Sequence, residues 1–167
     1  MLLRDAGVDV DPADRRAIEV VATGLPREHG IPIAVDATMV SPLHSDGSPY
    51  AGAAERRGVA LARGRRAKET AYPELLASSR LRLLTAGVET GGRLSSEALQ
   101  LLTDLSGVKV QSETPVLRGA LARAWRARWV TMVSTVCQNA LAATLVDDGV
   151  SLLELPAPLA HCRWTCG

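Results

Sequence analysis

Two acidic residues lie inside apolar segments of the chain, and a lysine and a tyrosine follow on a helical segment. Glu19 and Asp36 each stand within a β-branched apolar run that predicts a strand. Burying a carboxylate is costly unless something compensates it, and two carboxylates on neighbouring strands can share a divalent metal ion. Lys68 and Tyr72 are four residues apart and therefore share one helix face. Two acids and a lysine favour metal-assisted phosphodiester cleavage.

In this hypothesis Glu19 and Asp36 hold Mg²⁺, which orients and activates the attacking water. Lys68 holds the scissile phosphate and stabilises the transition state, while Tyr72 contacts the phosphate or orients Lys68. Plainer interpretations remain open for three of these residues. Glu19 fits a solvent-exposed strand edge or an ion pair with Arg16, Lys68 fits a solvated helix face, and Tyr72 fits the core. Asp36 is harder to explain structurally, because its segment is too apolar for an edge strand.

The hydrophobic pattern predicts the elements that must position these residues. Strands are expected over 16–23 and 33–41, a helical region broken by Gly58 and Gly64 over 51–78, a third strand over 80–90, a helix from 95, and a long helix over 116–147. The first two strands are expected to be antiparallel. The third is expected to be parallel to the second, because the helical region makes a crossover between them.

With 167 residues, the chain is long enough for one domain with its own core. The predicted class is α/β, with a small mixed sheet of about three to four strands, a crossover helix and a long C-terminal helix. We expect the domain to span residues 15–148. Residues 1–14 are expected to be a disordered lead-in, and residues 149–167, with their Cys and His residues, an irregular tail.

The net charge of +1 gives no global signature of a nucleic-acid-binding protein. The basic residues are nevertheless almost all arginine, which favours forked contacts with phosphate. We therefore predict DNA contacts by Arg65, Arg66, Arg118 and Arg126. A GC-rich genome, which enriches Arg, Ala and Gly together, is an equally good explanation of the composition. The 3% aromatic content, without any Phe, offers no platform for stacking single-stranded bases.

Three cysteines, an odd number, do not suggest a disulfide framework. The N-terminal residues lack the pattern of a signal peptide, and no apolar run reaches the roughly 20 residues that cross a bilayer. We therefore expect a nuclear or intracellular protein with no membrane association.

A second constellation lies at Glu89-Thr90-Gly91-Gly92, at the end of the predicted third strand. An acid beside a glycine turn at the carboxyl end of a parallel strand is a favoured position for ligand binding. The glycines fit a simple turn equally well, and the segment matches no nucleotide-binding motif. Glu89 is thus expected at most to assist the proposed centre.

Five strings of the sequence resemble a known family. They are Gly24-Leu25-Pro26, the segment from Ile33 to Leu43, Ala67-Lys68-Glu69-Thr70-Ala71-Tyr72, Val88-Glu89-Thr90-Gly91-Gly92, and the segment from Ala140 to Val146. Residues 16–148 are similar to the C-terminal segment of reverse-transcriptase-bearing non-LTR retrotransposon proteins, of the type abundant in dinoflagellate genomes.

The resemblance implies a restriction-like endonuclease core of the PD-(D/E)XK type, which nicks target DNA with Mg²⁺. A reverse transcriptase domain in a longer parent protein is then the implied partner. Glu19 takes the position of the first acid, Asp36 the second, Lys68 the lysine and Tyr72 the tyrosine. The chain departs from the motif in having Ile18-Glu19 for Pro-Asp, and Thr38 where the standard lysine stands. An inactive remnant that binds nucleic acid or protein is the alternative function.

Overall fold

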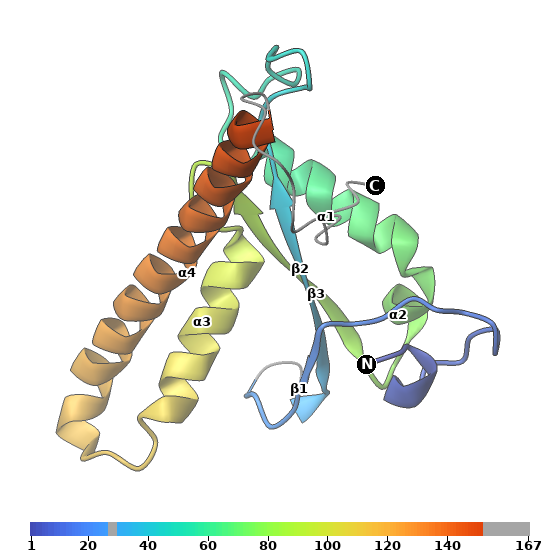
Figure 1. Ribbon diagram of the computed structural model, residues 1–167. Helices are drawn as coiled ribbons and strands as arrows, with labels where there is room; N and C mark the ends of the chain where they lie inside the picture. The colour runs from blue at the N-terminus through green and yellow to red at the C-terminus, as the bar shows by residue number, and fades with distance from the viewer. Residues whose placement is uncertain (27–29, 152–167) are drawn as a thin grey trace.

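Three strands form one mixed sheet in the order β1-β2-β3, with β2 in the middle (Figure 1). The computed structural model describes residues 1–26 and 30–151. The strands are β1 (Val20–Ala22), β2 (Ile33–Val40) and β3 (Arg82–Glu89). β1 is antiparallel to β2, and β3 is parallel to it. The α/β class, the small mixed sheet and the strand directions predicted from the sequence are therefore confirmed.

Two helices, α1 (Val59–Ala71) and α2 (Pro73–Ala77), form the crossover between β2 and β3. The sequence predicted breaks at Gly58 and Gly64. Gly58, with a φ of 80°, does precede the first turn of α1, but the helix continues through Gly64. It ends instead at Tyr72, because a residue before proline disfavours the helical conformation. Pro73 then occupies the first turn of α2, where its missing N–H costs nothing.

Helices cover both faces of the sheet (Figure 1). Alternate residues of β2 and β3 point to opposite faces, so each face has its own core. On one face Ala34 and Leu81 pack with Leu75 of α2 and with Tyr72, which lies between α1 and α2. The other face packs against α3 (Ser96–Lys109) and α4 (Pro115–Ser151). The side chain of Ser95 begins α3 by accepting a hydrogen bond from the N–H of Ala98 at 3.1 Å.

The expectation that residues 1–14 form a disordered lead-in outside the domain is wrong. Arg4–Ala6 form a turn of 3-10 helix. Leu3 is only 1% exposed and belongs to the core on the α1 side of the sheet. Its N–H donates to the carbonyl of Arg16 at 3.2 Å. The segment lacks hydrophobic periodicity because a few apolar side chains, rather than a regular element, attach it to the core.

The long C-terminal helix was predicted to end at Asp147, and α4 continues four residues further, to Ser151. The part of the predicted irregular tail from 152 to 167 lies outside the described residues. From Pro115 to Val146, α4 is long and apolar enough to cross a membrane by length and composition, with a mean hydropathy of 1.3 over its most apolar stretch. In this structure Val130, Val133 and Cys137 pack against the core beside β3 and α3. The absence of membrane association stays a prediction.

Candidate active site

Asp36 is a buried carboxylate on the central strand. The residue is 3% exposed, and in β2 it follows the buried Ile33 and Ala34. Its register partner in β3 is Thr85, which is also buried. Even-numbered residues of β2 share the face covered by α1, so the Asp36 side chain points toward that helix. An ionised group at this depth requires a compensating charge or ligand.

Lys68 supplies the compensating charge from α1. Its Nζ lies 2.9 Å from Oδ2 of Asp36, with side-chain exposures of 28% and 4% respectively. The ammonium is within ion-pair distance, but its direction does not meet hydrogen-bond geometry, so Oδ2 is buried without an aligned donor among the described residues. Asp36 therefore has charge compensation from Lys68, while its Oδ2 has no hydrogen bond of good geometry among the described residues.

Gly64 allows α1 to lie close enough to β2 for this contact. A Cβ at Gly64 would be 2.7 Å from Cγ1 of Val40 and 3.3 Å from Cγ2 of Thr38. Lys68 is one turn further along the same helix face. The close approach of helix and strand thus brings the lysine over Asp36.

Tyr72 lies four residues beyond Lys68, at the residue that immediately follows α1. It is 8% exposed, and its hydroxyl donates to the carbonyl of Ala17 at 3.0 Å. Burial, and then the negative charge of Asp36, raises the pKa of the Tyr72 phenol above its usual value. This hydroxyl connects α1 to the segment that precedes β1. The geometry favours positioning of the neighbouring groups over direct contact with a phosphate.

Glu19 lies immediately before β1. Since Val20 is paired with Val35 in an antiparallel register, position 19 falls opposite Asp36 on the neighbouring strand. Glu19 is exposed, and its Oε2 accepts a hydrogen bond from the N–H of Ala37 at 3.0 Å. The two acids thus lie on adjacent parts of the sheet.

Arg16 was an alternative partner for Glu19, but it pairs with other carboxylates. Its Nη2 lies 2.6 Å from Oδ2 of Asp14 and 2.7 Å from Oε1 of Glu74 in α2. These contacts lower the pKa values of both carboxyls, chiefly through the hydrogen bonds from Arg16. Glu19 is therefore a strand-edge carboxylate whose negative charge Arg16 does not neutralise.

The donor set at this site fits a hard divalent cation only in part. Within residues 1–26 and 30–151 no three acidic, His or Cys side chains are grouped as metal ligands. Asp36 and Glu19 offer two carboxylates, and Asp36 has the unsatisfied oxygen described above. Mg²⁺ commonly uses one or two carboxylates and completes its shell with water and substrate phosphate. Two carboxylates are therefore sufficient for magnesium but too few for a closed, all-protein metal site.

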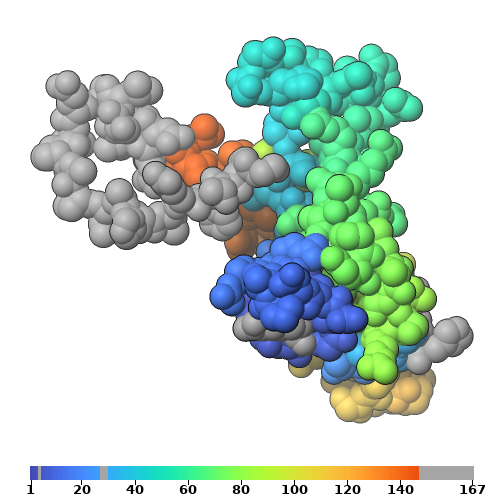
Figure 2. Space-filling view, turned by 90° about the vertical axis from the view of Figure 1, so that its right-hand side faces the viewer, coloured from blue at the N-terminus to red at the C-terminus, as the bar shows by residue number. Residues whose placement is uncertain are grey.

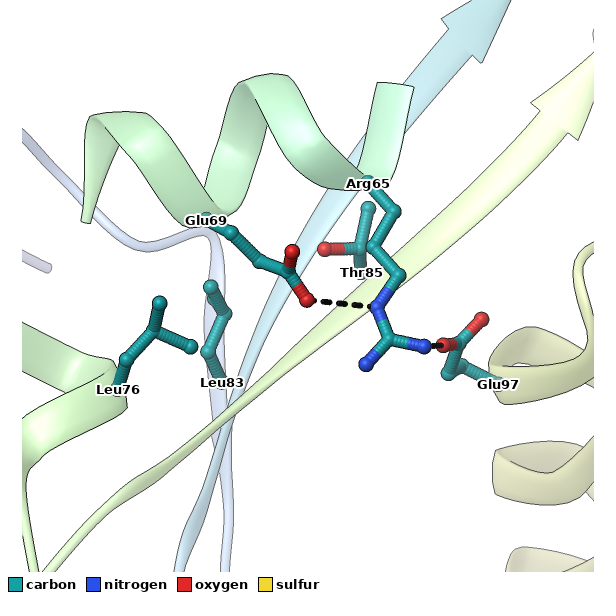
Figure 3. A pocket seen from close by; sticks show the side chains of 6 residues that line it. All are labelled: Arg65, Glu69, Leu76, Leu83, Thr85 and Glu97. Carbon is teal, nitrogen blue, oxygen red and sulfur yellow. Dashed lines mark hydrogen bonds and ion pairs between the residues drawn. The ribbon is translucent and has the colours of Figure 1, made fainter. Parts of the chain in front are cut away.

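Arg65, predicted to contact DNA, is held by two carboxylates (Figure 3). Its Nε donates to Oε1 of Glu69 at 2.7 Å, and its Nη1 contacts Glu97 at the start of α3. These acids raise the pKa of Arg65, with the hydrogen bond to Glu69 as the main cause. The three side chains line a small pocket of about 70 Å³ above Thr85. The positive charge of Arg65 is thus largely used within the protein.

The other predicted DNA contacts are divided between the two helical layers. Arg66 is exposed on α1. Arg118 donates from Nε to the carbonyl of Glu113 at 2.8 Å, at the start of α4. Arg126 is partly buried on the same helix, with its Nε inaccessible. Because α4 covers the face of the sheet opposite α1, the structure does not bring Arg118 and Arg126 to the side that holds Asp36.

Glu89 is at the end of β3 and is also separate from Asp36 and Lys68. It is the register partner of Val40, four residues beyond Asp36, which corresponds to about 13 Å along the strand. The residue is 8% exposed, and its Oε2 lies 3.6 Å from Nε of Arg93. Ser134 of α4 donates to the carbonyl of Gly92 at 2.9 Å, so the glycine turn serves as a contact for α4. The expected assistance from Glu89 stays a prediction.

Sequence reasoning missed two contributors to the site. Thr85 lies beside Asp36 on the neighbouring strand, and its position follows only from the register of β2 and β3. The N–H of Ala37 holds Glu19 next to Asp36. The shortness of β1 leaves this donor without a strand partner, and nothing in the sequence pattern sets that length.

Comparison with family models, curated proteins and solved structures finds no match to this chain.

Proposed function

We propose that this chain is a retrotransposon-derived, Mg²⁺-dependent endonuclease-like domain that nicks DNA at the cluster of Asp36, Lys68 and Glu19. The observation that carries the proposal is the ion pair of 2.9 Å between Lys68 and the buried Asp36 on the central strand. A buried carboxylate with a lysine above it and a second acid on the next strand is suited to phosphodiester chemistry. The sequence resemblance supports the finer proposals, a restriction-endonuclease-like core and a reverse transcriptase domain in a longer parent protein.

Each residue has a separate task in this proposal. Asp36 and Glu19 hold the metal ion, which when bound supplies Lewis acidity and an activated water. Lys68 leaves its contact with Asp36 for the scissile phosphate and stabilises the negative charge that develops there. Tyr72 keeps Lys68 in position by attaching α1 to Ala17. In the reaction the water oxygen would bond to phosphorus and release a proton to solvent, one phosphate ester bond would break, and the released oxygen would take up a proton from solvent.

A catalytically inactive nucleic-acid-binding remnant is the second candidate. Two observations favour it. Glu19 replaces the shorter Asp of the family motif, and its carboxylate is engaged by the N–H of Ala37. A longer side chain held by the backbone needs to move before it shares a cation with Asp36.

Conversion of supercoiled plasmid to the open circle tests the proposal, with Mg²⁺, Mn²⁺ or EDTA in the buffer. The informative variants are Asp36→Asn, which keeps the side-chain shape, and Lys68→Ala. Glu97→Gln is the matched control, since it removes an ion pair of α1 that does not include Asp36 or Lys68. We expect metal-dependent nicking by the wild type and the control, and none by the other two. Absence of nicking by folded wild-type protein would move the conclusion to the inactive remnant.

A further inference from the structure

Four arginines stand exposed along α1 and the loop that leads into it. Arg56 and Arg57 belong to the loop, and Arg63 and Arg66 lie three residues apart on one side of the helix. We call these four residues the α1 ridge. Figure 2 views the molecule from this side, where the loop and α1 form one continuous outer surface.

The positive charge of the α1 ridge is available to a ligand. Among the described residues, no carboxylate forms an ion pair with Arg57, Arg63 or Arg66. Arg65, on the same helix, is by contrast paired with Glu69 and Glu97. Residues 51–72 contain six basic residues and two acidic ones, so this segment is strongly positive although the whole chain is nearly neutral.

Arg63 is also held in place before any ligand arrives. Its guanidinium lies 3.5 Å from the ring centroid of Tyr50, and His44 packs on Tyr50 with ring centroids 3.8 Å apart. A guanidinium stacked on an aromatic face loses less conformational freedom when it binds an anion. The stack also fixes the loop between β2 and α1 against the helix.

The α1 ridge is on the same helix as Lys68. Arg63 is five residues before Lys68, which is about 7.5 Å of helix rise. Because each residue turns the helix by about 100°, Arg63 and Arg66 are about 140° and about 200° around the axis from Lys68, so the ridge faces solvent while Lys68 faces the sheet. The exposed arginines of α4 are on the opposite layer.

We propose that the α1 ridge binds the phosphodiester backbone of DNA, independently of sequence, on the outer face of α1. This inference rests on the proposed function for the identity of the ligand as DNA. Forked guanidinium contacts suit phosphate oxygens. A membrane surface is a poorer fit, because between Leu43 and Leu76 no large apolar side chain is exposed to enter the lipid.

Binding of a labelled DNA duplex of about 30 base pairs, measured by fluorescence anisotropy in EDTA, tests the inference. The ridge variant carries Arg57→Gln, Arg63→Gln and Arg66→Gln. The matched control carries Arg118→Gln, Arg123→Gln and Arg128→Gln, three exposed arginines of α4. Arg128 is a particularly close match to Arg63, since it also lies over an aromatic ring, that of Trp125.

We expect the ridge variant to bind DNA roughly 10-fold or more weakly, and the slope of log affinity against log salt to fall by about 2.7, or 0.9 for each lost phosphate contact. The α4 control is expected to keep the wild-type affinity and slope. An equal loss in both variants, or no DNA binding by the wild type, would overturn the inference. Ridge-dependent binding to vesicles containing phosphatidylserine, without binding to DNA, would also overturn it.

The same assay separates this inference from the proposed function. Asp36→Asn is expected to bind the duplex as the wild type does, because it does not alter the ridge. If the wild type binds DNA through the ridge but fails to nick plasmid, DNA binding by the ridge is supported and the endonuclease proposal is contradicted. If the wild type nicks plasmid and the ridge variant binds DNA and nicks equally well, DNA binding by the ridge is contradicted and the endonuclease proposal stands.

Discussion

Lys68 and Arg65 are two cations three residues apart on α1, and they meet acids in opposite ways. Arg65 contacts two carboxylates, Glu69 and Glu97, and all three side chains are at least 24% exposed. Lys68 contacts one carboxylate, Asp36, whose side chain is 4% exposed. The first arrangement lies in solvent and holds helices together. The second places charge inside the protein.

The difference indicates which pair is harder to explain by a contribution to stability alone. An exposed ion pair stabilises a protein by about 0.2–1 kcal/mol. Burying a carboxylate is unfavourable unless both charge and hydrogen bonds compensate it, and Asp36 retains an oxygen without an aligned hydrogen bond. A buried polar atom without a hydrogen bond is rare in native proteins, and a catalytic or ion-binding role is one of its explanations. The pair of Asp36 and Lys68 is thus the better candidate for chemistry, and Arg65 for structure.

Exchanging lysine and arginine at these two positions should give the largest difference between them. We expect Lys68→Arg to lower the nicking rate roughly 100-fold, because the longer planar guanidinium displaces the charge from its position over Asp36. Arg65→Lys should leave nicking nearly unchanged, since only the contacts to Glu69 and Glu97 suffer. Rates of plasmid nicking measure both effects. Equal rates for Lys68→Arg and the wild type would contradict a catalytic task for this lysine.

The close packing that brings Lys68 to Asp36 can be tested at Gly64. A methyl group there meets Val40 at 2.7 Å, so we expect Gly64→Ala to destabilise the fold by about 1–3 kcal/mol despite its higher helix propensity. Gly107→Ala in α3 is the control, because no atom lies within 4 Å of the added Cβ. The control should be neutral or stabilising by up to about 1 kcal/mol. Urea unfolding measures both, and equal midpoints would show that α1 is free to shift.

Double-mutant cycles sharpen the comparison energetically. We expect the coupling between Lys68 and Asp36, from Lys68→Met and Asp36→Asn, to be about 1–2 kcal/mol, since one partner is buried and the other is partly exposed. The coupling between Arg65 and Glu69, from Arg65→Met and Glu69→Gln, should be about 0.2–1 kcal/mol. Free energies of unfolding give both values. A larger coupling for the exposed pair would reverse the assignment made above.

The smallest expected effect is on the alkaline side of the stability profile. The folded state raises the pKa of Tyr72 above its ordinary value of 10.0. Between the unfolded and the folded pKa only the unfolded chain loses the proton, so stability is fully present below pH 10 and declines as the pH rises beyond it. Tyr72→Phe should lack this contribution to the decline. Thermal melts of both proteins across this range measure it, with identical profiles as the contradicting result.

Much of the fold follows from local sequence pattern. The β-branched run of β2 and the apolar run of β3 predicted both strands to within two residues, and the helical crossover between them fixed their parallel direction. The glycines predict a break at Gly64, whereas α1 and α2 are separated at Tyr72-Pro73. A residue before proline leaves the helix more readily than a glycine interrupts it.

The sequence predicted the two acids, the lysine and the tyrosine of the candidate site, but neither their contacts nor the neighbouring Thr85. Spacing put Lys68 four residues before Tyr72 and Asp36 inside a strand, whereas the packing of α1 over Asp36 is a tertiary feature. The partners of Arg16 and Arg65 depend on α2 and α3, which approach from distant parts of the chain. Likewise, the layer on which Arg118 and Arg126 lie is set by the side of the sheet that α4 covers. Hydrophobic periodicity does not determine which elements pack against one another or which face of the sheet a helix covers.

The shortness of β1 has a consequence for the solubility of the protein. Its pairing with β2 stops at Val35, so beyond that point no described strand covers this edge of the sheet. Open edges of this kind recruit strands from other molecules and lead to aggregation. Glu19 occupies the N–H of Ala37 and adds a negative charge at the point where such pairing would begin. Replacing Glu19 with Ala would thus expose the N–H of Ala37 at this edge and favour aggregation. Replacing it with Gln keeps an acceptor for that N–H and should favour aggregation less.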